Sequence, residues 1–185
     1  MTPTDMGSVT KSYLDWSISE IVRDMKEEIL YVSEEVVDER ACENLRPISY
    51  ELPDGKSVEL KGERIKILEK FFQPNDMLPG FSGVHQMVVE SVTKAEIDIR
   101  RDLFQNIILS GGNTHFKGFM DRLMRLIPDI SPNNVKVKVT GSAERKHSAW
   151  IGGSILSSLG SFQQMWMSKQ EYEEHGSIMV ERKCA

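Results

Sequence analysis

The sequence predicts an α/β protein in which a smaller helix–hairpin–helix part precedes the main domain. Apolar segments with helical spacing alternate with short segments typical of strands, which is the pattern of α/β domains. One stretch, residues 106–118, joins both kinds of element: an apolar run ends at Gly111 and Gly112, and helical spacing follows from Phe116. The 185 residues are enough to bury a core in one domain or two small ones.

The composition is typical of globular domains, with 39% hydrophobic and 28% charged residues. A net charge of −5 argues against a nucleic-acid-binding surface. Cys42 and Cys184 form no disulfide framework, and the four histidines lack metal-ligand spacing, so we expect no metal site and a reducing compartment. No apolar run reaches the roughly 18 residues of a membrane helix, and the N-terminus does not resemble a secretion signal. We expect an intracellular protein without membrane contact.

The first elements follow from capping and periodicity. Residues 1–16 are polar and lack periodicity, so we expect a loose lead-in. Ser17 and Glu20 match a capping box, and helical spacing then predicts a long amphipathic helix ending by about Asn44 or before Pro47.

Period-two alternation over 48–60, around a Pro-Asp-Gly turn, predicts a β-hairpin. A short helix then opens at Gly62 and ends at Pro74. The Pro/Gly-rich loop 73–83 carries apolar residues that either pack on the core or face a partner.

The second half of the sequence predicts alternating helices and strands. A helix over about 84–93 is followed by an acid–base segment, 96–102, that leads into the central strand. A helix over 116–127 precedes Pro128 and Pro132, and a half-exposed edge strand follows over 135–139, with lysines that discourage unwanted pairing. An apolar helix over 148–159 and a last helix over 161–174, ending at Gly176, complete the chain.

The turn after the central strand has two interpretations. Backbone N–H groups at a helix start attract anionic or polar ligands, and paired glycines let a ligand approach closely. The same strand–Gly-Gly–helix pattern also occurs as a tight packing corner.

Ordered blocks of the sequence resemble the actin family. They include YELPDG (50–55), FQP (72–74), DIR (98–100), LSGG (109–112), ERK (144–146), WIGGSIL (150–156), FQQMWMSKQEY (162–172) and RKC (182–184). The resemblance runs from about Glu20 to the C-terminus and covers only the C-terminal half of an actin. It implies a partial actin-like ATPase fold of the ribonuclease H-like type, without the N-terminal half.

By resemblance, residues 17–72 correspond to subdomain 4, 73–147 to subdomain 3, and 148–185 to the C-terminal helices of subdomain 1. Both phosphate-binding hairpins of the family, and the groups that organise metal and hydrolytic water, lie upstream of the matching region. Since hydrolysis requires phosphate, metal and water held in line, the resemblance implies no catalytic residue and no metal ligand here.

The adenosine side of the family's nucleotide site remains. The residues that resemble it are Arg23, Lys26, Glu27, Gly111, Gly112, Asn113, His115, Phe116 and Lys146. His115 replaces the usual Met and Phe116 the usual Tyr, so the hydroxyl hydrogen bond is lost. We expect no firm cofactor: ATP or ADP with magnesium binds only if the cleft is completed, and otherwise these residues simply pack.

A second family site is the cleft that receives partner helices. Only one of its two walls corresponds to residues of this sequence. Its residues by resemblance are Ile151, Ile155, Leu156, Leu159 and Met165. They form either an exposed apolar patch or core, and we favour core for Ile151 and Leu156. Loop 73–83 resembles the plug of actin filaments, but Asp76 and Pro79 depart from the usual sequence.

The resemblance leads us to expect an actin-like or actin-related cytoskeletal protein acting as a non-catalytic structural or interaction module. The alternative is a fragment of an ATP-hydrolysing, filament-forming actin whose N-terminal half is supplied elsewhere. A third interpretation is a regulatory fragment that competes for actin-binding proteins. Partners would be actin-binding or cytoskeletal proteins, actin, or the chain itself, in cytoplasm, cytoskeleton or nucleus. By this resemblance, Trp150, Ile155 and Phe162 would pack against strands that this sequence does not contain. We therefore expect marginal stability or oligomerisation.

Overall fold

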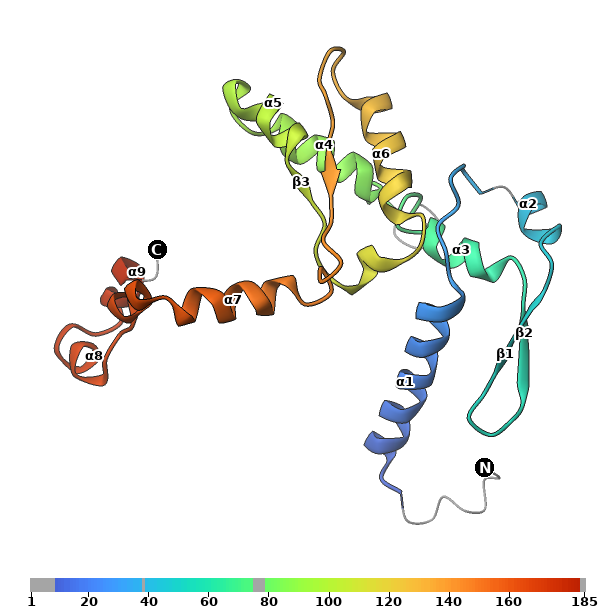
Figure 1. Ribbon diagram of the computed structural model, residues 1–185, viewed down its shortest axis with the longest axis horizontal. Coiled ribbons are helices and arrows are strands. Elements are labelled where there is room, and N and C mark those ends of the chain that lie inside the picture. Colours follow the sequence, from blue (N-terminus) through green and yellow to red (C-terminus); the bar gives the residue numbers. More distant parts are fainter. Residues whose placement is uncertain (1–8, 38, 75–78, 184–185) are drawn as a thin grey trace.

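The computed structural model describes residues 9–37, 39–74 and 79–183. Its elements are α1 (Lys11–Ile29), α2 (Glu39–Glu43), β1 (Ile48–Glu51), β2 (Ser57–Leu60), α3 (Glu63–Glu69), α4 (Val84–Thr93), α5 (Ile97–Gln105), β3 (Ile107–Ile108), α6 (Phe119–Ile130), β4 (Val139–Thr140), α7 (Ser148–Ser158), α8 (Lys169–His175) and α9 (Ile178–Lys183). Helix α1 and the β1–β2 hairpin extend from one side of a central group of helices, and α7 projects away from it toward α8 and α9 (Figure 1).

The first helix corrects two expectations. It begins at Lys11, within the expected lead-in, and the Ser17 hydroxyl donates to the Leu14 carbonyl inside the helix instead of capping it. It ends at Ile29, far before Asn44, because the backbone is extended at Leu30. Val32 N–H then donates to the Lys117 carbonyl at 2.8 Å, so a contact with a distant segment overrides the helical periodicity.

The hairpin has the predicted position and an antiparallel register that pairs Ile48 with Leu60 and Tyr50 with Val58. Gly55 lies in its turn at φ 79°, a conformation that glycine adopts without strain. The Tyr50 hydroxyl donates to Asp24 Oδ2 at 2.8 Å and ties the hairpin to α1. The hydrogen bond with Asp24 raises the pKa of Tyr50.

A parallel pair, β3 with β4, forms the second sheet, with Ile107 opposite Val139 and Ile108 opposite Thr140. The expected strand over 135–139 is therefore wrong in extent. Lys138 N–H instead donates to the Phe104 carbonyl at the end of α5, so residues 135–137 have no strand beside them.

The core lies between α3, α4, α5, α6 and the β3–β4 pair. Helix α6 contributes Phe119, Arg122, Leu123 and Ile127, whose spacing places them on one helical face. This helix begins at Phe119, not at 116, and continues past Pro128 to Ile130. Helix α5, which occupies the expected acid–base segment, buries Phe104.

An ion pair lies inside this core. Arg122 Nη2 is 3.0 Å from Glu69 Oε1, and the two side chains are 1% and 8% exposed. The other Arg122 amino group donates to the Ser33 carbonyl at 3.0 Å, and the guanidinium lies 5.4 Å from the centre of the Phe72 ring. Burial raises the pKa of Glu69, and Arg122 opposes that rise.

The C-terminal segments contact little of this core. Helix α7 has almost the predicted bounds and contains no buried residue. The expected last helix, 161–174, is wrong: a 3₁₀ turn (Gly160–Met165) precedes α8, which begins at Lys169 because Ser168 caps it by accepting from Glu171 N–H. Gly176 follows α8 as expected. Among the described residues, no helix is long and apolar enough to cross a membrane.

Candidate functional site

The turn after β3 differs from a simple strand-to-helix corner. Gly111 has φ 92°, and a 3₁₀ turn, Gly112–His115, follows before α6. Gly118 precedes α6 at φ 83°, and a Cβ there would lie 2.3 Å from the Val32 carbonyl oxygen. The positive φ and the close approach of Val32 explain glycine at 118, a requirement that the sequence analysis missed.

Arg145 holds this turn in place. Gly111 N–H donates to the Arg145 carbonyl at 2.8 Å, and the guanidinium donates from Nε to Thr114 Oγ1 and from Nη2 to the Thr114 carbonyl, both at 3.1 Å. Sequence reasoning missed Arg145. Its position beside Lys146 in the ERK block was the available signal.

Five of the nine predicted nucleotide-site residues line one small pocket. They are Glu27, Gly112, His115, Phe116 and Lys146, and the pocket has a volume of about 150 Å³. Residues separated by more than a hundred positions thus meet: α1 supplies Glu27, and the segment before α7 supplies Lys146.

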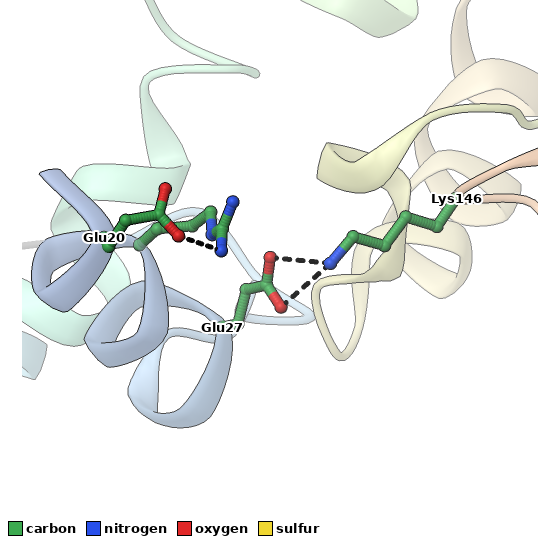
Figure 2. Close-up of polar contacts among 4 residues, drawn as sticks. Glu20, Glu27 and Lys146 are labelled. Carbon is green, nitrogen blue, oxygen red and sulfur yellow. Dashed lines mark hydrogen bonds and ion pairs between the residues drawn. The ribbon is translucent and has the colours of Figure 1, made fainter. Parts of the chain in front are cut away.

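An ion pair joins these two sides of the pocket. Lys146 Nζ donates to both carboxylate oxygens of Glu27, at 3.0 and 3.1 Å (Figure 2). The hydrogen bond from Lys146 lowers the pKa of Glu27, and both side chains remain about half exposed.

The other predicted nucleotide residues do not line the pocket. Arg23 lies one turn before Glu27 on α1 and pairs with Glu20. Lys26 is exposed on α1, Asn113 is exposed in the 3₁₀ turn, and the Gly111 amide is taken by Arg145.

The pocket of about 150 Å³ is smaller than typical ligand pockets. Ligand pockets generally have volumes of about 300–1,000 Å³, and here the Glu27–Lys146 pair joins the two sides of a smaller space. No cluster of three or more potential metal ligands occurs among the described residues. The arrangement is a polar contact between α1 and the segment before α7.

The predicted partner-cleft residues lie on or just after α7. Ile155 is 60% exposed, Leu156 47%, Leu159 49% and Met165 43%, whereas Ile151 is half-buried. The expectation that Leu156 belongs to the core is therefore wrong, because no described part of the chain covers this side of α7. Of the plug-like loop, 75–78 (with Asp76) lies outside the described residues, and Pro79 is exposed.

The chain belongs to the actin family, whose model, described as Actin, matches residues 1–185. The match thus also includes the residues before Glu20. Actin-related protein 4 of Arabidopsis thaliana is 40% identical over 195 residues, and actin-related protein 4 of Oryza sativa subsp. japonica is 41% identical over 194 residues. Each alignment covers 97% of this chain and 44% of the relative. The chain spans less than half the length of these curated relatives.

Proposed function

We propose that this chain is a non-catalytic interaction module of the actin-related type, which binds partner proteins through the apolar side of α7. The observation that carries the proposal is that Ile155, Leu156 and Leu159 are all exposed by more than 40% on one short segment. Side chains of this kind presented by a helix suit an amphipathic partner helix. Its partners would be actin-binding or cytoskeletal proteins, or actin, in the cytoplasm, cytoskeleton or nucleus.

A labelled amphipathic peptide with leucines at helical spacing tests the interaction by fluorescence anisotropy. We expect saturable binding that Ile155→Glu weakens at least tenfold. Ile67→Glu is the matched control, because Ile67 is also a helical isoleucine and is 52% exposed, but lies on α3. Absence of binding to the folded chain, or equal losses in both variants, would contradict the proposed site.

A second candidate is a piece of an ATP-binding, ATP-hydrolysing, filament-forming actin whose other half is supplied elsewhere. Two observations favour it: the 44% coverage of the relatives, and the gathering of five adenosine-side residues at one pocket. Titration of the chain with a fluorescent ATP analogue and Mg²⁺, competed with unlabelled ATP, separates the two candidates. We expect no competable binding at micromolar concentrations, whereas saturable micromolar binding (about −8 kcal/mol) would favour the second candidate.

A further inference from the structure

The start of α4 is held closely against the end of α3. Val84 N–H donates to the Phe71 carbonyl at 2.8 Å, and a Cβ added to Gly83 would lie 2.1 Å from the Phe72 carbonyl oxygen. The ring of His85, in the first turn of α4, stacks on the ring of Phe72 with 6.0 Å between the centres and 29° between the planes. A hydrogen bond, a close backbone approach and a ring contact thus join the two helices.

The ring of His85 has one nitrogen that suits only the neutral form. Its Nδ1 atom is buried and has no hydrogen-bond partner within the described part of the chain. A neutral imidazole keeps one nitrogen unprotonated, whereas an imidazolium carries a proton on both. Protonation would therefore place a buried N–H at Nδ1 without an acceptor, which costs the desolvation of that group.

Two positive neighbours also oppose a charge on His85. The guanidinium of Arg122, in α6, lies 5.4 Å from the centre of the same Phe72 ring. The N-terminus of a helix carries a partial positive charge, so a cation in the first turn of α4 is unfavourable. Burial of His85, and after it the charge of Arg122, lower the pKa of His85 below the ordinary 6.5.

The acids of the surrounding elements are engaged elsewhere. Glu69, in α3, pairs with Arg122. Glu90, the one acid within α4, accepts from the Ser82 hydroxyl at 3.1 Å. Glu35, in the segment after α1, is exposed. The charge that acts on His85 is that of Arg122, and it has the same sign as an imidazolium.

We propose that His85 forms an acid-sensitive contact: its neutral ring holds the start of α4 against the end of α3, and its protonation releases that start. Each opening then takes up one proton, so the open form gains on the closed form as the pH falls. The gain is at most about tenfold per pH unit and is confined to the range from the ordinary 6.5 down to the lower folded pKa. Above that range the contact is fully formed. The proposal is independent of partner binding at α7.

Amide exchange in the full chain, followed by NMR from pH 7 to pH 5, tests this contact. The Val84 amide reports on it directly, because its acceptor is the Phe71 carbonyl. We expect its protection factor to fall with pH in the wild-type chain and to stay constant in His85→Phe, which keeps an aromatic ring but cannot titrate. His175→Phe, the same change at an exposed histidine of α8, is the matched control and should behave as the wild type.

Two further readouts keep the test independent of that variant. The Leu123 amide, within α6, reports opening of the core and should not follow Val84. The ring signals of His85 should titrate below pH 6.5. Constant protection of Val84 in the wild-type chain, an equal fall in His85→Phe, a parallel fall at Leu123, or titration of His85 at or above pH 6.5 would each overturn the proposal.

Discussion

The buried pair of Arg122 and Glu69 is costly to break by removing one partner. Arg122→Met leaves the Glu69 carboxylate in the core without its guanidinium, and removal of one partner of a buried pair costs about 3–5 kcal/mol of unfolding free energy. The double variant with Glu69→Leu removes both charges, and we expect it to be more stable than Arg122→Met. Urea unfolding of the three proteins measures this order, and a double variant less stable than the single would contradict it.

Arg122→Met should also change the pH dependence of stability. Burial already raises the pKa of Glu69, and loss of Arg122 removes the largest opposing influence. The folded state then binds a proton that the unfolded state has released, so the unfolding free energy falls as the pH rises from the unfolded pKa of Glu69 through its folded pKa. Urea titrations of the variant at a series of pH values measure that slope, which should be absent when Glu69→Leu is added.

The Glu27–Lys146 pair gives the opposite pH dependence of the unfolding free energy. Its hydrogen bonds lower the pKa of Glu27 below the ordinary 4.5, so its stabilising effect is present above that value and is lost as the pH falls through the lower folded pKa. Lys146→Met should return the pKa of Glu27 toward 4.5 in a carboxyl NMR titration. Lys169→Met, which breaks the distant pair with Glu173, is the control and should leave the pKa of Glu27 unchanged.

Among the elements, the start of α6 depends on one glycine. Gly118 and Gly55 have nearly equal φ angles, 83° and 79°, but an added Cβ meets the Val32 carbonyl at 118 and nothing within 4 Å at 55. Gly55→Ala therefore costs only the left-handed backbone strain, about 1–2 kcal/mol. Gly118→Ala adds displacement of the segment after α1, so its loss of unfolding free energy should be clearly larger. Equal losses of unfolding free energy in the two variants, measured by denaturant unfolding, would show that the Val32 backbone moves away at no cost.

The elements predicted well from sequence are those determined by local interactions. The hairpin around Gly55, helix α4 and helix α7 all carry their own turn or periodicity signals. The end of α1 could not be predicted because it depends on Lys117, which is distant in sequence. The grouping of Glu27 with Lys146 came from family resemblance alone. Arg145, whose contacts with Thr114 appear only in three dimensions, was missed.

For the molecule as a whole, the large exposed surface predicts a weak response to denaturant. An unfolded chain of this mass exposes about 30,600 Å², so folding to 13,953 Å² buries roughly three-quarters of the area that a compact monomer would bury. The urea m-value scales with that area. We therefore expect the chain to unfold with about three-quarters of the m-value of compact proteins of equal length. An m-value in the compact range would contradict the open arrangement.

The distribution of buried residues has a consequence for local stability. Within the described chain, the last buried residue is Val139, and none follows it in α7, α8 or α9. Amide protons are protected from solvent exchange by the free energy needed to open the structure around them, and that free energy is low where few side chains are buried. We expect residues 148–183 to exchange their amides long before α6 does. The core elements α3 to β4 and residues 148–183 are thus two regions of unequal protection within one chain, and slow exchange in α7 would report that its apolar side is covered.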